Sequence, residues 1–366
     1  MFVHYEESIL SSIAALRSYY GLASSYEDEV RFKEIINNKK PKKVFLMLVD
    51  GMGANLISKK LDKDAFVNKY MLYKTQTVFP PTTTAATTAI LNGKAPCENA
   101  WLGWSMYFKE VDDEVIPFFG KGLYSGIDYG KDFVKKLLPV TEIVDELNKK
   151  GIKAYNLYPS WRENGCDSFK EMCERLLSYS NSDEYDFIYA YWDKYDSLMH
   201  KVGPSALEAD QCLLDINDNL EKLKDGLNED TMLIVIADHG QVDIHRDYNL
   251  ANSEYKEYFA HRPTVEPRAM AFYIKEDKRE IFRTKFINEF ENDYVLLSQK
   301  EVLDTKLFGD KANHPRLIEF IGDYLAIAKS DLCLSYKEEG ESFKFKGQHA
   351  GMCEDELLIP FIVYMK

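Results

Sequence analysis

The sequence predicts an α/β fold in which helices cover both faces of a mostly parallel central sheet. Short, continuous apolar runs alternate with amphipathic helical patterns along most of the chain. Continuous apolar runs are typical of strands that are buried on both faces, as they are in parallel sheets. In addition, the three clearest runs each end in acidic residues, at the strand ends where open α/β sheets bind ligands.

The expected elements follow one another in a regular order. The core strands are expected at 44–49, 152–158, 186–192 and 231–237, and the helices at 141–150, 168–177 and 205–223. The limits of the first helix are marked by Thr141, a good N-cap, and by Gly151, which suits the position after a helix end. Strands that alternate with helices in this way build a two-sided, mostly parallel sheet.

The 366 residues divide into three predicted regions. An N-terminal helical extension is expected at 1–40, an α/β core at 41–265 and 333–366, and an inserted α+β lobe at 266–332. The lobe is distinguished by more charge and more aromatic side chains. Its expected elements are a strand, a helix and a strand at 269–274, 279–289 and 294–297.

Acidic residues outnumber basic ones, because 60 Asp and Glu stand against 46 Lys and Arg, which gives a formal net charge of −14. A negative surface is unsuited to nucleic-acid polymers and to anionic membranes, which bind positive surfaces. It also disfavours anionic small molecules, unless a bound divalent cation reverses the local charge. No apolar run is long enough for a membrane span, so no membrane partner is expected.

The six cysteines form no CxxC pair and are too sparse for a disulfide scaffold, so we interpret them as buried free thiols. The first residues show neither a basic n-region nor the apolar segment of a signal peptide. A cytoplasmic location is therefore expected. The sequence makes no prediction of the oligomeric state.

Acids and histidines follow three of the predicted strands. Asp50 follows the first strand, Asp196 and His200 follow the third at helical spacing, and Asp238 and His239 follow the fourth. Three carboxylates at one sheet edge would repel one another, and a divalent metal, for which Asp and His are ordinary ligands, would remove that repulsion. Taken singly, each motif is also compatible with a turn or a surface helical pair.

Two further segments carry polar groups suited to a phosphate or a metal. His349 lies in the glycine-flanked loop GQHAG at 347–351. The segment FPPTTTAATTAILNG at 79–93 places two prolines and several threonines at the start of a helix, where free N–H groups favour phosphate. A threonine there is equally compatible with a plain N-cap, and its hydroxyl is a weak nucleophile unless a base or a metal ionises it.

Together these motifs resemble the alkaline phosphatase superfamily, and within it most closely the nucleotide pyrophosphatase/phosphodiesterase branch. The motifs are DGMG at 50–53, FPPTTT at 79–84, DSLMH at 196–200, ADHG at 237–240 and GQHAG at 347–351. They stand in the family's order along nearly the whole chain. The resemblance implies that the predicted sheet is arranged as in alkaline phosphatase.

The resemblance also implies two divalent metal ions, with zinc as the first choice. The first would be bound by Asp50, Asp238, His239 and the nucleophile, and the second by Asp196, His200 and His349. The branch's pattern FPSKTFPN fits 79–86 without a gap and places the nucleophile at Thr83, which would be a metal ligand as well. Thr82 and Thr84 stay open as alternatives.

The chain departs from the branch at one position that bears on the substrate. The branch commonly has Asn three residues after the nucleophile, where it helps to hold the phosphate oxygens, and this chain has Ala86. That hydrogen bond is expected either to come from Asn55 or backbone N–H groups or to be absent. Trp101, Trp104 and Trp161 are candidates for stacking on a base or lining an aryl pocket, with core packing as the alternative.

The expected function is metal-dependent hydrolysis of phosphodiester or pyrophosphate bonds in nucleotide-type small molecules, through a phospho-threonine intermediate. A phosphomonoesterase or phosphonate hydrolase with the same site is the first alternative, and a catalytically silent metal-binding protein is the second. The sulfatase motif C-x-P-x-R is absent. The cofactor-independent phosphoglycerate mutases rank lower because they normally use Ser as the nucleophile.

Overall fold

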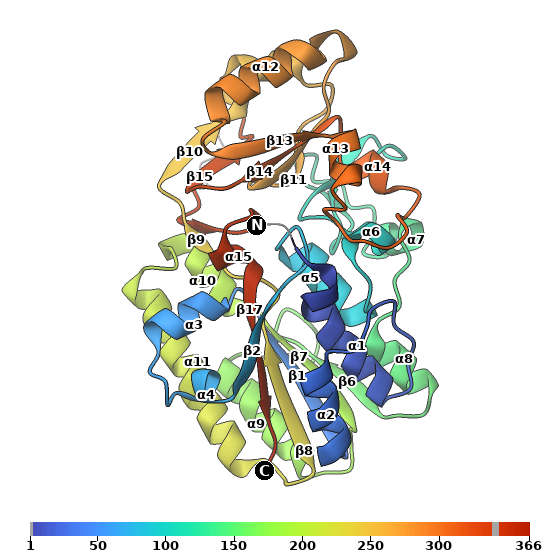
Figure 1. The fold of residues 1–366 in the computed structure, drawn as a ribbon, viewed down its shortest axis with the longest axis vertical. Coiled ribbons are helices and arrows are strands. Elements are labelled where there is room, and N and C mark those ends of the chain that lie inside the picture. The colour runs from blue at the N-terminus through green and yellow to red at the C-terminus, as the bar shows by residue number, and fades with distance from the viewer. Residues whose placement is uncertain (1–2, 339–343) are drawn as a thin grey trace.

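The computed structural model describes residues 3–338 and 344–366 and has a six-stranded sheet at its centre (Figure 1). The strands are β1 (Lys43–Val49), β2 (Met71–Gln76), β6 (Ala154–Leu157), β7 (Phe187–Trp192), β8 (Thr231–Ile236) and β17 (Leu358–Tyr364). Their order is β2-β17-β8-β1-β7-β6, and only β17 runs against its neighbours. The predicted α/β class with a mostly parallel sheet is therefore confirmed.

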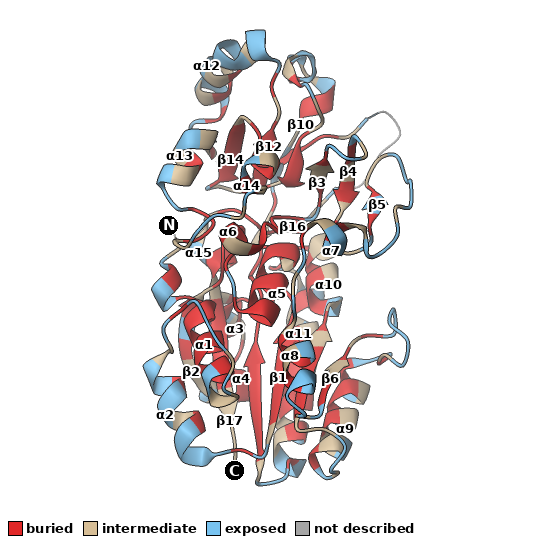
Figure 2. Ribbon diagram, turned by 90° about the vertical axis from the view of Figure 1, so that its right-hand side faces the viewer, coloured by how far each residue is buried: buried red, intermediate tan, exposed pale blue. Residues whose placement is uncertain are grey.

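Helices cover both faces of this sheet, as Figure 1 shows. One group consists of α1 (Ile9–Tyr19), α2 (Val30–Lys39), α5 (Thr83–Asn92) and α8 (Ile143–Lys149). The other consists of α3 (Ala54–Lys60), α4 (Phe66–Lys69), α9 (Phe169–Ser180), α10 (Lys194–Val202) and α11 (Leu207–Gly226). The central strands β1 and β8 are almost wholly buried between the two groups (Figure 2). This burial explains why their sequences are uninterrupted apolar runs.

A second, antiparallel sheet lies beyond the carboxyl ends of the core strands (Figure 1). Its strands, in spatial order, are β11 (Thr264–Glu266), β12 (Ala269–Phe272), β14 (Tyr324–Ala328) and β13 (Tyr294–Ser298). The helix α12 (Arg279–Phe290) packs on it through Phe282, Phe286 and Phe290, which belong to a separate hydrophobic cluster. The pair β10 (Arg246–Asn249) and β15 (Leu332–Ser335) adds side chains to the same cluster.

Shorter elements connect these layers. The strands among them are β3 (Met106–Phe108), β4 (Asp113–Ile116), β5 (Lys121–Gly122), β9 (Val242–Asp243) and β16 (Gly347–Gln348). The helices are α6 (Pro96–Asn99), α7 (Phe133–Leu137), α13 (Gln299–Asp304), α14 (Leu317–Phe320) and α15 (Glu354–Leu357), with 3-10 turns at η1 (Tyr5–Glu7), η2 (Leu250–Asn252), η3 (Glu254–Tyr258) and η4 (Glu276–Lys278). No helix within the described ranges is long and apolar enough to span a bilayer.

The structure differs from the sequence prediction at the margins of the core. The first 40 residues do carry helices, but α1 is part of the main hydrophobic core, through side chains such as Ile9 and Ile13. The second hydrophobic cluster includes Leu250 and Tyr336, so it extends past both expected limits of the lobe at 266–332. Segments that are distant in sequence supply this cluster, which a local change of composition does not reveal.

Candidate active site

The three predicted strand-end acids meet at one edge of the core sheet. Val49 pairs with Trp192 and Leu48 pairs with Ile236, so β1, β7 and β8 end at the same level. Asp50 and Asp238 follow two of these ends, and Asp196 lies in the first turn of α10 after the third. All three carboxylates are buried.

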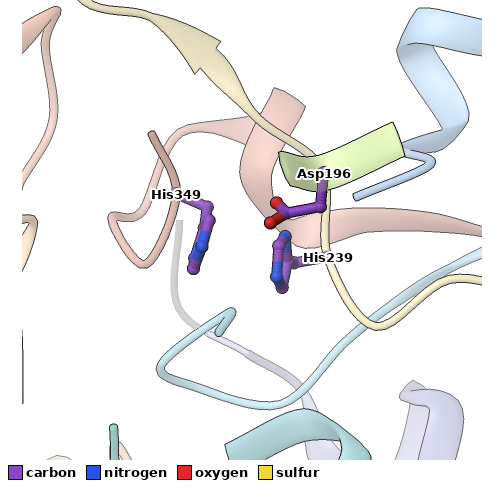
Figure 3. Close-up of side chains that lie close together, drawn as sticks. All are labelled: Asp196, His239 and His349. Carbon is purple, nitrogen blue, oxygen red and sulfur yellow. The ribbon is translucent and has the colours of Figure 1, made fainter. Parts of the chain in front are cut away.

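Carboxylates and imidazoles form two overlapping groups that could each hold a metal ion. The first group is Asp50, Asp238 and His239, and the second is Asp196, His239 and His349, with ligand atoms in each group within 4.8 Å of one another. The second group is shown in Figure 3, where Asp196 points towards His239 while His349 lies beside it. His200 lies next to this group, because its Nε2 is 3.2 Å from Oδ2 of Asp196.

This arrangement differs in two details from the ligand sets implied by the resemblance. His200, which was expected in the second set, belongs to neither group. His239, which was expected in the first set only, is close enough to contribute to either group. The rings of His239 and His349 stack with centroids 3.8 Å apart, whereas the rings of His200 and His349 are 5.2 Å apart. His239 therefore lies between the two groups.

Three backbone carbonyls set the orientation of the imidazoles. The Nδ1 atoms of His200, His239 and His349 lie 2.9, 3.0 and 3.0 Å from carbonyl oxygens of Gly347, Gly240 and Pro81. Because a carbonyl oxygen only accepts, each Nδ1 carries the proton. The lone pair of each neutral ring is then on Nε2, which is the tautomer that a metal ligand needs.

The buried acids hold more negative charge than the protein itself neutralises. Burial, together with the charges of neighbouring acids, raises the pKa of Asp50 and Asp238. Burial would also raise the pKa of Asp196, but the adjacent His200 lowers it below its ordinary value. Oδ2 of Asp238 is buried and accepts no hydrogen bond within the described chain. This unsatisfied oxygen and the mixed carboxylate and imidazole donors fit divalent metal ions.

Only one of the three candidate threonines faces these groups. The Thr83 hydroxyl lies 3.2 Å from Nε2 of His239 and 3.3 Å from Oδ2 of Asp50. The hydroxyl of Thr82 is buried and donates to Glu266 instead, while that of Thr84 is buried without a hydrogen-bond partner in the described chain. Thr83 begins α5, so the unpaired N–H groups of the first helical turn adjoin it.

The candidate site opens into one large cavity of about 1420 Å³ between the core and the antiparallel sheet. Thr83, Asp50 and His349 belong to its lining. Three of its aromatic residues are well exposed: Trp104 (40%), Phe119 (54%) and Trp161 (49%). A cavity of this size with apolar walls and a polar end is suited to a small-molecule ester.

The remaining substrate-binding candidates have different surroundings. Trp101 lines the cavity, but it is only 1% exposed and its Nε1 donates to the Leu138 carbonyl, as expected for a core residue. Asn55 is not part of the cavity lining. Its amide nitrogen donates to Asp355 at 2.7 Å, and its amide oxygen accepts from Lys74.

Three residues at the site were not singled out in the sequence. Tyr191 donates a hydrogen bond to Asp50, and Gln241 donates to Asp196. Glu266 ends β11 and lines the cavity beside α5, the helix that begins at Thr83. Tyr191 alternates with apolar residues in a strand, and the other two follow no recognised motif, so only the tertiary structure reveals their positions.

The same fold is found in solved structures of enzymes that act on phosphorus compounds. Murine and human ectonucleotide pyrophosphatase/phosphodiesterase 5 match with TM-scores of 0.68 and 0.67, each at 16% identity over 88% of both chains. Phosphonoacetate hydrolase from Sinorhizobium meliloti, solved with phosphonoacetate, matches with a TM-score of 0.65 at 14% identity over 88% of this chain and 90% of its own. No curated protein sequence matches significantly.

The sequence pattern of one family spans most of the chain. The family is described as type I phosphodiesterase/nucleotide pyrophosphatase, and its model matches residues 44–351. This range contains every acid and histidine of the two candidate metal groups. The chain therefore belongs to the type I phosphodiesterase/nucleotide pyrophosphatase family of metal-dependent hydrolases.

Proposed function

We propose that the protein hydrolyses phosphodiester or pyrophosphate bonds of nucleotide-type small molecules, with Thr83 as the nucleophile. The observation that carries the proposal is the position of the Thr83 hydroxyl, within 3.3 Å of both Asp50 and His239 at the end of a large cavity. Thr82 and Thr84 direct their hydroxyls elsewhere. In a member of this family, a hydroxyl in this position is suited to attack the phosphorus atom of a bound ester.

We propose that the metal ligands are divided between two divalent ions, with zinc as the preferred metal. One ion would be held by Asp50, Asp238, His239 and Thr83, and the other by Asp196, His200 and His349. Such a pair of ions supplies Lewis acidity, which lowers the pKa of a bound hydroxyl and offsets charge on phosphoryl oxygens. The closeness of His239 to both groups is compatible with ligation of either ion.

The chain's own groups then account for each step of the reaction. The Thr83 hydroxyl loses its proton to water and its oxygen bonds to phosphorus, while the bond to the leaving oxygen breaks on the opposite side and that oxygen takes up a proton from water. The product is a phosphate ester of Thr83, which a water molecule hydrolyses to regenerate the hydroxyl. Free N–H groups in the first turn of α5 are placed to donate to phosphate oxygens. They could supply the hydrogen bond that is missing at Ala86.

The exposed rings of Trp104, Phe119 and Trp161 favour a planar leaving group or base on the substrate. An inactive variant of the murine relative has been solved in complex with AMP, and it matches this chain with a TM-score of 0.69 at 16% identity. This likeness supports nucleotide-type substrates. The likeness to phosphonoacetate hydrolase keeps phosphonate hydrolysis as the second candidate.

The decisive variant is Thr83→Ala, assayed with a p-nitrophenyl phosphodiester at defined metal content. We expect the fold and the bound metal to persist while kcat falls by about a thousandfold or more, because the nucleophile is lost. Thr84→Ala is the matched control, since its hydroxyl is buried away from the ligands, and it should retain activity. Comparable activity of Thr83→Ala and the wild type would exclude Thr83, and an inactive wild type with every metal tried would favour the silent alternative.

A further inference from the structure

Glu266 is a buried acid beside the candidate nucleophile that has no neutralising partner in the described chain. It is 6% exposed and lines the cavity that contains Thr83. Its Oε1 accepts hydrogen bonds from the Thr82 hydroxyl and from the backbone N–H of Trp104, the latter at 2.8 Å. These two contacts fix the carboxyl group one residue away from Thr83.

The cations nearest to Glu266 in sequence are paired with other acids. Arg262 binds Glu338 at 2.9 Å, and Arg268 binds Glu356 at 2.7 Å. The described residues contain no lysine, arginine or histidine that forms an ion pair with Glu266. Burial without such a partner raises the pKa of Glu266 to about 7. At mildly alkaline pH this side chain is a fixed negative charge next to the reaction centre.

Two other acids of the cavity, Glu142 and Asp193, each have a lysine nearby. Glu142 forms an ion pair with Lys135 at 3.1 Å. Asp193 accepts a hydrogen bond from Nε1 of Trp161 at 3.1 Å and has Lys194 within 3.9 Å. Asp132, the remaining acid of the lining, is exposed to solvent. Among the described lining residues, and apart from the proposed metal ligands, Glu266 is therefore the buried acid that lacks a cation partner.

We propose that Glu266 is a specificity-determining residue that favours singly charged phosphodiesters over doubly charged phosphomonoesters. The inference rests on the proposed function, because it assumes that the phosphoryl group binds at Thr83. A phosphomonoester carries a second ionised oxygen above about pH 6, whereas a diester keeps one charge. Like charges held a few ångströms apart in a partly desolvated site repel each other strongly, so the second charge disfavours monoesters.

The test compares p-nitrophenyl phosphate with its methyl ester, which share one leaving group, on metal-loaded protein at mildly alkaline pH. Glu266→Gln keeps an acceptor for Thr82 and Trp104 but removes the charge. We expect the kcat/KM ratio of monoester to diester to rise about tenfold in this variant. Glu142→Gln, a cavity acid that already has a cation partner, should leave the ratio unchanged. An unchanged ratio in Glu266→Gln, even with both activities lowered, would overturn the inference.

A binding measurement separates this inference from the proposed function. In metal-loaded protein that carries Thr83→Ala, which should hydrolyse neither ligand, calorimetry can compare the binding of AMP with that of its singly charged methyl ester. Glu266→Gln should improve the affinity for AMP relative to the methyl ester by a similar factor. If the wild type hydrolyses nothing but this shift is found, the proposed function fails and the charge selectivity stands. Equal affinity ratios with and without Glu266→Gln would refute the selectivity on their own.

Discussion

At the scale of single residues, the rings of His200, His239 and His349 are oriented so that Nε2 can bind a metal ion. Backbone carbonyls of Pro81, Gly240 and Gly347 hold the three Nδ1 protons. Burial and the neighbouring His239 lower the pKa of His349, so that ring is neutral at physiological pH. A neutral, oriented imidazole binds a metal ion without first losing a proton or changing its rotamer.

Replacement of His349 should therefore weaken metal binding specifically. His349→Ala is expected to lower the bound metal from two ions per chain towards one, with at least about tenfold weaker retention of the second ion. His245→Ala is the control, because His245 is largely exposed and pairs only with Asp331. Elemental analysis after dialysis measures the difference. A full complement of metal in His349→Ala would exclude it as a ligand.

At the scale of elements, the segment that presents His349 is held by a buried ion pair. Glu356 of α15 accepts from Arg268 at 2.7 Å and from the backbone N–H groups of Gly351 and Cys353 at 2.7 and 3.1 Å. Arg268 comes from the connection between β11 and β12 and also donates to backbone carbonyls after β14. The ion pair thus joins the antiparallel sheet to the loop after His349, where Ala350 adopts φ +86°.

Removal of one partner of this ion pair should destabilise the fold. Glu356→Gln leaves the Arg268 guanidinium buried without a counter-charge, so we expect the free energy of unfolding to fall by roughly 3–5 kcal/mol. Glu174→Gln, in the solvent-exposed pair with Lys170, should cost less than about 1 kcal/mol. Urea unfolding of both variants gives the comparison. Equal losses would show that the buried pair is no more important than a peripheral one.

At the scale of the whole molecule, stability and metal content are expected to be linked. The chain has a net charge of −14, and several of its acids are crowded at the carboxyl edge of one sheet. Burial and mutual repulsion raise the pKa of Asp50 and Asp238, which means that their ionised forms destabilise the metal-free fold. Bound cations would turn this repulsion into attraction and stabilise the native state.

Removal of metal by a chelator should accordingly lower the thermal unfolding midpoint at neutral pH, and added zinc should restore it. The same reasoning predicts that Asp238→Asn changes the stability of the fold in opposite directions with and without bound metal. This variant should be more stable than the wild type when both are free of metal, since one unpaired charge is gone, and less stable when both are loaded. Calorimetry in both states tests this, and the same sign in both would contradict the proposed role.

Sequence patterns predict the centre of the fold better than its edges. The strands β1 and β8 are uninterrupted apolar runs because they are buried on both faces. The edge strand β2 was not predicted, because its half-exposed sequence MLYKTQ includes Lys74. The antiparallel direction of β17 was not predicted either, because no local pattern fixes it. Direction and register depend on partners that are far away in the chain.

The candidate ligands could be predicted because strand ends concentrate them in short motifs, and the structure brings Asp50, Asp238 and His239 together. The role of Asn55 stays a prediction, because its side chain contacts Asp355 and Lys74 and lies outside the cavity lining. Glu266 was overlooked because its position depends on how β11 packs against the start of α5. Such contacts between separate layers leave no periodic trace in the sequence.

Two layers build the cavity: Thr83 at the start of α5 and the acids at the carboxyl edge of the core sheet lie on one side, while the antiparallel sheet supplies Glu266 and part of the wall. Under the proposed function, the groups that break the bond and the groups that select the substrate belong to different layers. Substitutions in the outer layer can change which esters are admitted while the reacting groups keep their places.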